Sequence, residues 1–363
     1  MAEKTVLVDA HCFDGSGQGI VSYIQGIYSE LLKDSDLDIT FACHNIEKIK
    51  TILGQEAKII MIPYENFLYR LLIFFPRLLR SGKYQFAHFQ YILPFFLSRK
   101  VKYITTIHDI IPIDFPNLYT IAYRLKVFFL FGRAAKKSDI VCTVSDYSKE
   151  RIAKRFKIDE EKIFITPNAV KNIFFSKEKK ISPISKPYFL FVSRIEERKN
   201  HLLLLKVFVE KHFYEKYNLV FVGKNSSKNT LLYAYYAKLP IEIKNSINFI
   251  SSISDEELIT YYQNSDLFVY PSIAEGFGIP PLEAALANCK VVCSNATAMS
   301  DFSFFKKYSF SPYSQSELEK KISAVLIDEN YPFEEIKAKI ENQYSWKSSA
   351  DVLRKVILAE VSK

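Results

Sequence analysis

The stretch Tyr270-Pro-Ser-Ile-Ala-Glu275-Gly-Phe-Gly-Ile-Pro-Pro-Leu-Glu283 follows the short apolar run 267–269 and carries the sharpest structural signal in the chain. Its Gly-x-Gly turn lets the backbone come close to a ligand. Its proline pair predicts the start of a helix whose first amides are free. The stretch therefore predicts a strand, a tight turn and a helix, with Glu275 and Glu283 eight residues apart.

Similar apolar runs, rich in β-branched and aromatic residues, recur on both sides of this stretch. They cover residues 5–8, 39–42, 103–107, 140–144, 188–192, 219–222, 267–269 and 290–293. Because amphipathic segments separate them, they predict parallel strands joined by helical crossovers. The Lys-, Ser- and Pro-rich segment 177–187 lies between the two sets of runs and predicts a linker.

The sequence thus predicts two α/β domains and a terminal helix. The first domain is expected over 1–180 and the second over 181–344. Segment 345–363 reads as an amphipathic helix with Ser345 as its N-cap.

Composition limits the class of protein. The 363 residues are 48% hydrophobic and 25% charged, which is typical of a globular protein with a core in each domain. No stretch near 20 residues lacks charge and the N-terminus does not resemble a signal peptide, so we expect a cytoplasmic protein without a spanning helix. The five cysteines lie in apolar runs without a Cys-x-x-Cys pair, which predicts reduced core thiols and no structural metal.

Positive charge is concentrated in the first half. Residues 1–180 hold 27 Lys and Arg against 19 Asp and Glu, whereas 181–363 hold 22 against 21. Segment 66–108 has seven basic residues and no acidic one. We expect a polyanionic partner or an anionic membrane surface as the target.

Part of this segment has the pattern of an interfacial helix. Large apolar residues at 67–75 lie next to Arg70, Arg77 and Arg80. A helix packed in the core, with only its arginines in water, explains the same pattern nearly as well. The basic residues favour the membrane interpretation, so we expect the protein at the inner face of the membrane.

Two features of the first half come after predicted strands. The glycine-rich segment 14–20 precedes a helix expected to begin near Val21, but its spacing fits neither a dinucleotide fingerprint nor a P-loop. An ordinary flexible turn explains it equally well. His108 and Asp109 end another strand, at the carboxyl edge of the sheet where ligands of α/β folds bind. Taken alone, a structural role for this pair is favoured, with Asp109 accepting from the imidazole or capping the turn before Pro112.

In the second half, Arg194 and Lys199 lie five positions apart across a strand-to-helix turn. Both could contact one anion beside the N-terminus of the helix expected at 201–209. A solvated charge cluster with Glu196 and Glu197 is the alternative.

Taken together, these motifs resemble the retaining glycosyltransferases of family four. The segment from Glu275 to Glu283 resembles the family's Glu-x7-Glu motif. The family's order is also followed by the glycine loop, His108-Asp109, 144–148, 166–168, the Arg-x4-Lys pair, 223–224 and the Tyr-Ser-Trp at 344–346. The resemblance implies the GT-B fold, in which two Rossmann-like domains face each other across a cleft and the C-terminal helix returns to the first domain.

The resemblance also implies roles for the Glu-x7-Glu segment. Glu283 would bind the nucleotide ribose and Glu275 the hydroxyls of the donor sugar. Phe277, Gly278 and Ile279 would offer backbone amides to the sugar or its phosphates.

Further roles are implied elsewhere. Arg194 and Lys199 would hold the donor diphosphate, and His108 would lie near the transferred sugar. Ser193, at a donor-binding position, replaces the glycine of many members. The loop closing over the donor corresponds to Gly17, Gln18 and Gly19. Segment 249–252 matches the place where the nucleotide base usually binds.

The implied activity is transfer of a sugar from a nucleotide diphosphate to a growing glycan with retention, without a metal or other cofactor. Segments 108–112 and 197–200 resemble mannosyltransferases of surface-polysaccharide assembly, which favours GDP-mannose as donor and a polyprenyl-linked acceptor. The alternatives are a UDP-sugar-dependent transferase and an inactive nucleotide-sugar-binding protein of the same fold. A nucleic-acid partner is not expected. The triplet Asp34, Asp36 and Asp38 imitates an Asp-x-Asp metal motif but is interpreted as surface.

Overall fold

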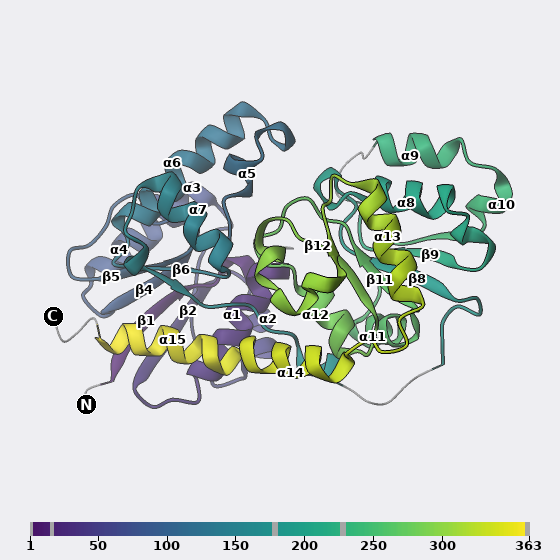
Figure 1. Ribbon diagram of the computed structural model, residues 1–363. Coiled ribbons are helices and arrows are strands. Elements are labelled where there is room, and N and C mark those ends of the chain that lie inside the picture. Colours follow the sequence, from purple (N-terminus) through teal and green to yellow (C-terminus); the bar gives the residue numbers. More distant parts are fainter. Residues whose placement is uncertain (1–2, 15–17, 176–180, 226–229, 360–363) are drawn as a thin grey trace. The chain divides into compact units, whose positions relative to one another are not determined.

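The computed structural model describes residues 3–14, 18–175, 181–225 and 230–359, and it divides the chain into two compact α/β units (Figure 1). Unit 1 comprises Met1–Ala169 and Tyr344–Lys363. Unit 2 comprises Val170–Gln343. The division lies before the segment 177–187 in which a linker was expected.

Unit 1 is built on a seven-stranded parallel sheet with the order β3-β2-β1-β4-β5-β6-β7. Its strands are β1 Lys4–Asp9, β2 Leu37–Cys43, β3 Lys58–Met61, β4 Phe86–Gln90, β5 Lys102–Thr106, β6 Ile140–Thr143 and β7 Ile163–Ile165. The strand order reverses between β1 and β4, and ligands of such sheets bind beyond the carboxyl ends of the strands at this point.

Helices cover this sheet through two apolar clusters. The helices of unit 1 are α1 Gln18–Leu31, α2 Ile46–Leu53, α3 Phe67–Tyr69, α4 Phe75–Arg80, α5 Ile111–Asp114, α6 Ile121–Lys137, α7 Asp146–Phe156 and α15 Trp346–Ala359, and a π-helical turn, Arg70–Phe74, joins α3 to α4. One cluster packs Leu71, Phe75 and Leu79 against the sheet residues Ala87 and Phe89. The other packs α6 and α7 against Ile107, which follows β5, Val141 of β6 and Ile163 of β7.

Unit 2 repeats the plan with a six-stranded parallel sheet of order β10-β9-β8-β11-β12-β13. Its strands are β8 Tyr188–Val192, β9 Asn218–Val222, β10 Ile247–Ile250, β11 Leu267–Tyr270, β12 Val291–Ser294 and β13 Ser309–Phe310. Its helices are α8 His201–Glu210, α9 Thr230–Ala237, α10 Ile241–Lys244, α11 Asp255–Asn264, α12 Ile279–Leu286, α13 Gln315–Leu326 and α14 Phe333–Gln343. The order reverses here between β8 and β11, the strands that precede the two motifs predicted to bind the donor.

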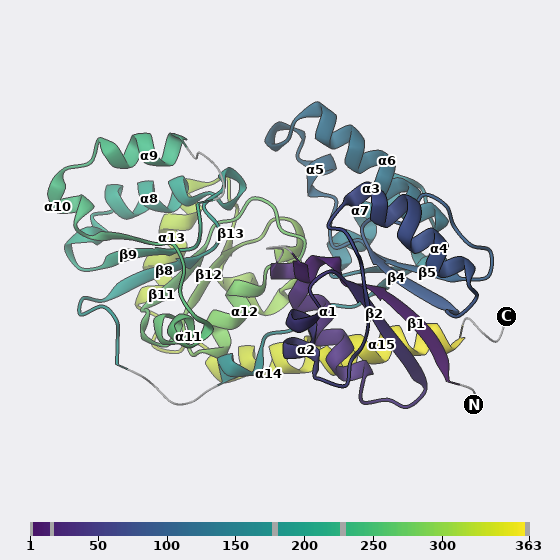
Figure 2. The same ribbon diagram turned by 180° about the vertical axis from the view of Figure 1, so that it is seen from behind.

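The terminal helix returns to unit 1, as the resemblance implied. The Ser345 hydroxyl accepts a hydrogen bond from the Ser348 amide, so the predicted N-cap is present. Helix α15 then packs along α1 (Figures 1 and 2). The aromatic ring of Trp346 lies over Gly26, where a Cβ atom would come within 2.1 Å of that ring.

The three aspartates of the Asp-x-Asp imitation have structural partners. Arg354 of α15 forms ion pairs with Asp34 and Asp36. Lys58 forms one with Asp38 at 2.6 Å. These contacts agree with the interpretation of the triplet as surface.

The predicted apolar runs all form strands. The sequence did not predict β3, β4, β7, β10 or β13. In β4, His88 and Gln90 interrupt the apolar pattern, yet the whole strand is buried. The side chains are tolerated because Tyr28 and Thr106 contact the His88 ring, at 2.6 and 2.8 Å. No helix in the described parts of the chain has the length and apolar character needed to cross a bilayer.

Candidate functional site

The predicted strand, turn and helix between residues 267 and 286 form as expected. Gly278 precedes α12 with a φ of 102°, a left-handed conformation that favours glycine. A Cβ atom there would also lie 2.3 Å from the Met299 sulfur. The glycine thus lets the loop turn into α12, whose first amides begin at Ile279.

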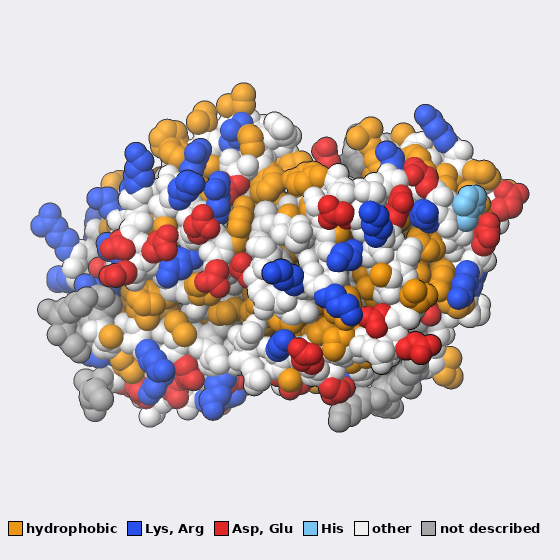
Figure 3. Space-filling model, viewed as in Figure 1, with side chains coloured by type: hydrophobic (Ala, Val, Ile, Leu, Met, Phe, Trp, Pro, Cys, Tyr) orange, Lys and Arg blue, Asp and Glu red, His pale blue; other side chains and the backbone are white. Residues whose placement is uncertain are grey.

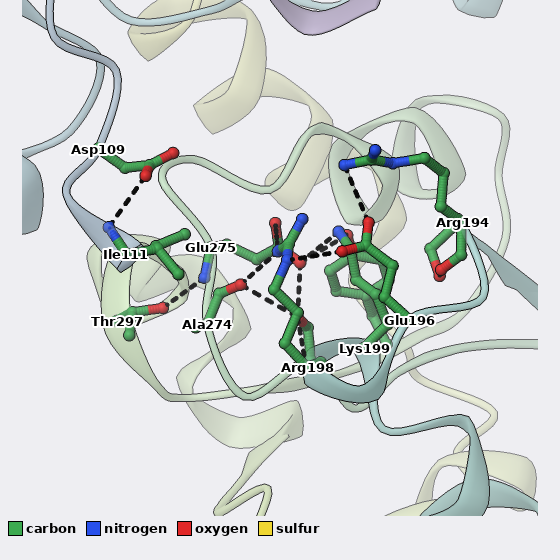
Figure 4. A network of polar contacts seen from close by, with 12 residues as sticks. Asp109, Ile111, Arg194, Glu196, Arg198, Lys199, Ala274, Glu275 and Thr297 are labelled. Atoms are coloured by element: carbon green, nitrogen blue, oxygen red, sulfur yellow. Dashed lines mark hydrogen bonds and ion pairs between the residues drawn. The ribbon is translucent and has the colours of Figure 1, made fainter. Parts of the chain in front are cut away.

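Glu275 lies in this loop and is surrounded by hydrogen-bond donors (Figure 4). It is 7% exposed. Its Oε1 accepts from Lys199 Nζ at 2.6 Å, from the Ser272 hydroxyl at 2.5 Å and from the Tyr270 hydroxyl at 3.0 Å. Its Oε2 lies 3.2 Å from Arg198 Nη1. Burial raises the pKa of Glu275, but the charges of Lys199 and Arg198 outweigh burial and bring the pKa to about 2. Glu275 is therefore a carboxylate.

Arg194 and Lys199 contact different carboxylates. Lys199 is buried against Glu275 and Tyr270, and burial lowers its pKa although Glu275 acts in the opposite direction. The Arg194 side chain is 62% exposed and lies 2.9 Å from Glu196 Oε1. Arg194 is thus accessible to a phosphate group, while Lys199 supports Glu275. Their roles toward a diphosphate stay a prediction.

Ser193 joins β8 to this charged turn. Its amide donates to the Val222 carbonyl at 2.9 Å, and its hydroxyl donates to the Arg194 carbonyl at 3.1 Å. The amide therefore continues the sheet ladder. Gly223 packs against the Ser193 backbone. Its φ is 147°, and a Cβ atom on Gly223 would lie 2.0 Å from the Ser193 carbonyl oxygen. The close approach of β8 and β9 depends on this glycine.

Glu283 has a different electrostatic environment from Glu275. It lies on α12, where the Tyr262 hydroxyl donates to its Oε2 at 3.0 Å. Burial raises the pKa of Glu283 to about 7, against smaller opposite effects of that hydrogen bond and of Lys171. Glu283 therefore titrates near neutral pH. The nearby Phe277 side chain packs on Phe302 in the core, so any ligand contact of Phe277 comes from its backbone.

In unit 1, His108 is held at the carboxyl edge of the sheet. Its Nε2 lies 2.9 Å from Gln90 Oε1, and its ring contacts the Tyr23 ring edge-on, with centroids 4.8 Å apart. Burial lowers the pKa of His108 to about 3, so the imidazole is neutral. Asp109 Oδ1 accepts from the Ile111 amide at 3.0 Å, which is the capping role, one of the two structural roles expected for it.

Two further segments were predicted to bind the donor, the glycine loop at 17–19 and segment 249–252. Gly17 and the Gln18 side chain lie outside the described residues, while Gly19 lies in α1, where a Cβ atom would have no neighbour within 4 Å. In segment 249–252, Phe249 stacks on Phe221 at 5.2 Å between ring centroids. Among the described residues, no group of three or more His, Cys, Asp or Glu could hold a metal ion.

The sequence did not indicate several partners of the site residues. They are Arg198, Tyr270 and Ser272 around Glu275, Tyr262 at Glu283 and Gln90 at His108. Arg198 precedes Lys199, and Tyr270 begins the stretch that contains Glu275. Their hydrogen-bonding side chains were the signal that could have marked them. Tyr262 and Gln90 come from other elements, so no local signal marked them.

Known families match both halves of the chain. Residues 19–171 match the family described as Glycosyltransferase Family 4, and residues 172–346 match Glycosyl transferases group 1. The chain thus combines a Family 4 half with a group 1 half and is a glycosyltransferase.

This glycosyltransferase has curated relatives in O-antigen synthesis. It is 35% identical over 194 residues to the O-antigen chain mannosyltransferase RfbU of Salmonella typhimurium, over 52% of this chain and 51% of that protein. It is 28% identical over 222 residues to the O-antigen chain mannosyltransferase B of Escherichia coli, over 58% of this chain and 56% of that protein. The aligned part thus spans about half the length of these relatives.

A solved structure supports the fold. The crystal structure of Anabaena Alr3699/HepE in complex with UDP-glucose matches 98% of this glycosyltransferase and 99% of that chain, with a TM-score of 0.71 and 13% identity. At this identity the likeness concerns the fold alone. With the two parallel-sheet units and the returning helix, it confirms the expected GT-B architecture of two Rossmann-like units.

Proposed function

We propose that this glycosyltransferase transfers mannose from GDP-mannose to a growing surface polysaccharide with retention of anomeric configuration. The observation that carries the proposal is the ionised Glu275, buried beside Lys199 and Arg198 in the loop that begins α12. A fixed carboxylate of this kind can accept sugar hydroxyls, and Glu283 on the same segment can accept those of the ribose. The mannose donor is favoured by the names of the two O-antigen relatives.

In the proposed reaction, the bond between the anomeric carbon and the diphosphate oxygen breaks while the acceptor hydroxyl oxygen bonds to that carbon. Negative charge grows on the leaving phosphate, and Arg194 and the first amides of α12 would stabilise such charge. The acceptor proton passes to the leaving phosphate. A double displacement would need a carboxylate nucleophile, but Glu275 is already engaged with two cations. These contacts favour the front-face route.

A donor screen tests this proposal. Thermal unfolding is measured with GDP, UDP and their sugars, since a ligand at about 100 times its Kd stabilises the fold by about 2.7 kcal/mol. GDP and GDP-mannose should raise the Tm, and GDP-mannose should be turned over. Stabilisation by UDP compounds alone would favour the UDP-sugar alternative, and binding without hydrolysis or transfer would favour the inactive binding protein.

We also propose that no metal takes part, because Arg194 and the first amides of α12 supply the positive charge. Turnover should then persist in EDTA, whereas Arg194→Ala should lower turnover by about 10²- to 10³-fold, the scale of a lost oxyanion contact. Loss of turnover in EDTA with recovery in Mn²⁺ would contradict this assignment.

The acceptor is proposed to be polyprenyl-linked and the site of action the inner, cytoplasmic face of the membrane. The segment from α3 to α4 has one face in the core, while Leu68 is 56% exposed and Ile73 is 40% exposed. A groove of about 260 Å³ lies on this outer side, lined by Leu72, Ile73, Pro76, Arg77, Arg80 and Phe96. Apolar side chains beside arginines suit a lipid with an anionic head group.

Helix α6 extends this apolar surface. Its Leu125 and Phe129 are 53% and 67% exposed. Figure 3 shows hydrophobic side chains along the upper edge of unit 1 over α6. Lys126 of α6 lies 5.3 Å from the Phe67 ring centroid, so α6 and α3 are neighbours. We refer to the exposed apolar residues of these two helices, of the π-helical turn and of the loop residue Phe96 as the outer apolar surface; they are Phe67, Leu68, Leu72, Ile73, Phe96, Ile121, Leu125 and Phe129.

The expectation that Arg70 belongs to this basic membrane surface is wrong. Arg70 is 8% exposed, and its Nη1 lies 3.6 Å from Asp9 Oδ1. The side chain is directed into unit 1, where Asp9 compensates its charge. Arg77 and Arg80 are the arginines of the segment that line the groove.

A further inference from the structure

Arg198 holds the glutamate loop from both its side chain and its backbone. It lies in the short helical turn Glu197–Lys199 after β8. Its Nη1 donates to the Ala274 carbonyl at 2.6 Å and lies 3.2 Å from Glu275 Oε2. Its own carbonyl accepts from the Ile273 amide at 2.8 Å. One residue thus fixes the loop at three consecutive positions.

Arg198 also lies in the middle of a series of alternating charges (Figure 4). The series runs through Arg194, Glu196, Arg198, Glu275 and Lys199. Exposure of the side chains falls along it, from 62% at Arg194 to 13% at Arg198 and 9% at Glu275. Removing Arg198 would take one cationic partner from each of two carboxylates, Glu196 and Glu275, and a buried charge that loses a partner is destabilising.

The two oxygens of Glu275 are not equivalent. Oε1 already accepts from three donors, Lys199, Tyr270 and Ser272. A carboxylate has about four lone-pair sites, two on each oxygen, so Oε1 has no acceptor capacity left. Oε2 is contacted by Arg198 and retains capacity for another donor. A sugar hydroxyl would therefore bind Oε2, the oxygen whose position Arg198 sets.

We propose that Arg198 is a positioning residue that fixes Glu275 Oε2 toward the hydroxyls of the transferred sugar. The inference rests on the proposed function of Glu275 as the sugar-binding carboxylate. Sugar transfer should then depend on Arg198, whereas binding of the nucleotide, which is proposed to involve Glu283 on α12, should not.

The first test follows the ionisation of Glu275 without any substrate. Charged or titratable groups around its carboxylate are Arg198, Lys199 and Tyr270, with Glu196 beyond Arg198. In ¹³C-glutamate-labelled protein, the Glu275 resonance, assigned by its loss in Glu275→Gln, should titrate at higher pH in Arg198→Met than in wild type. Arg198→Lys keeps the charge and should stay near the wild-type midpoint. An unchanged midpoint in Arg198→Met would overturn the proposal.

The second test separates turnover from nucleotide binding. Both Arg198→Met and Arg198→Lys should lower GDP-mannose turnover by about 100-fold, because a misplacement of 1 Å costs about that factor. The Kd of GDP should stay within about twofold of wild type. Lysine cannot replace arginine here, since one ammonium group cannot reproduce the planar arrangement of donors that contacts Ala274 and Glu275.

Lys290→Met is the matched control, because Lys290 is a cation of the same unit whose Nζ donates to two carbonyls, those of Val325 and Asp328. It should keep wild-type turnover. Wild-type turnover in both Arg198 variants, an equal loss of GDP affinity and turnover, or an equal loss in Lys290→Met would each overturn the positioning role. If wild type turns over no nucleotide sugar, the proposed function fails, while the titration of Glu275 still decides whether Arg198 controls this carboxylate.

Discussion

Two glutamates eight residues apart in one segment have opposite pKa shifts. Glu275 is held between Lys199 and Arg198, and its pKa lies at about 2. Glu283 has a tyrosine hydroxyl as its direct partner, and burial raises its pKa to about 7. The same residue type is thus permanently charged at one position and titratable near neutral pH at the other.

This difference predicts a pH dependence of nucleotide binding. Ionised Glu283 can accept hydrogen bonds from both ribose hydroxyls, so the affinity for GDP should increase as pH rises through about 7. Glu283→Gln should bind GDP about 10-fold more weakly and without this dependence, since a hydrogen bond to a charged group contributes about 1.5–3 kcal/mol. Calorimetric titration between about pH 6 and about pH 8 measures both quantities. The same slope in Glu283→Gln would show that another group is responsible.

The free protein provides a control with the opposite sign. The folded chain binds the Glu283 proton more tightly than the unfolded chain, because the pKa rises from 4.5 to about 7 on folding. Ionisation of Glu283 therefore destabilises the folded chain, and the free energy of unfolding should fall as pH rises from 4.5 to about 7. In Glu283→Gln the fall should be smaller.

Gly223 gives a second prediction for a single residue. Its φ of 147° disfavours any residue with a side chain, and a Cβ atom would lie 2.0 Å from the Ser193 carbonyl oxygen, so alanine fits only if the backbone moves. Gly223→Ala should lower the free energy of unfolding by about 1–3 kcal/mol and weaken GDP binding, since the turn carrying Arg194 must shift. Denaturant unfolding and calorimetry measure the two effects. In the same unfolding assay, Gly19→Ala in open helical space should not destabilise the fold.

At the scale of elements, packing of α15 on α1 depends on the absence of a side chain at Gly26. Trp346 fills that space and also contacts the Tyr23 ring, with centroids 6.5 Å apart. Ser349 and Arg354 add polar contacts to Pro167 and Asp36. A small residue in α1 thus determines where the end of the chain docks.

The only tryptophan of the chain reports this docking. Gly26→Leu should expel Trp346 from its contact, so the fluorescence emission should shift to longer wavelength and the Tm should fall, as overpacking costs about 1–3 kcal/mol. Gly19→Leu makes the same change in the same helix where nothing lies within 4 Å. Emission that is unchanged in Gly26→Leu, or equally shifted in both variants, would contradict this packing.

The segment from α3 to α4 shows why an apolar helix is ambiguous in sequence. The packed-core interpretation holds for Leu71, Phe75 and Leu79, which are fully buried. The exposed Leu68 and Ile73 belong to the outer apolar surface. The packed-core interpretation therefore holds for one side of the segment, and the interfacial interpretation of the other side stays a prediction.

At the scale of the whole molecule, excess positive charge and the outer apolar surface occur in the same unit. Basic residues near an anionic bilayer contribute about 1 kcal/mol each. The chain should therefore sediment with anionic vesicles, less with neutral ones, and binding should weaken as salt rises. Arg77→Glu with Arg80→Glu should lower the bound fraction severalfold.

A matched pair of charge changes controls for net charge. Lys211→Glu with Lys216→Glu replaces two exposed lysines of unit 2 and changes the net charge of the chain as much as the two arginine changes do. This variant should bind vesicles nearly as wild type does. Equal binding to neutral and anionic vesicles, or equal losses in the two double variants, would contradict a membrane surface at Arg77 and Arg80.

The sequence by itself determined features that depend on neighbouring residues. Apolar runs such as 188–192 and 219–222 became strands because their patterns are local and their strands are buried on both faces. Ser345 capped its helix because a hydroxyl needs only the amide three residues later. Gly278 and the prolines after it likewise predicted the turn into α12 from local backbone preferences.

Only the tertiary structure decided the chemistry of the site residues. Lys199 meets Glu275 across 76 positions of sequence, and Tyr262 meets Glu283 across 21. Such contacts set which carboxylate is charged, and they separated Lys199 from Arg194 although the two lie five positions apart. Arg70 was expected at the surface and is buried because Asp9, at the end of β1, offers it a counter-charge. Burial and partner charge depend on how distant segments pack, and no local pattern contains that information.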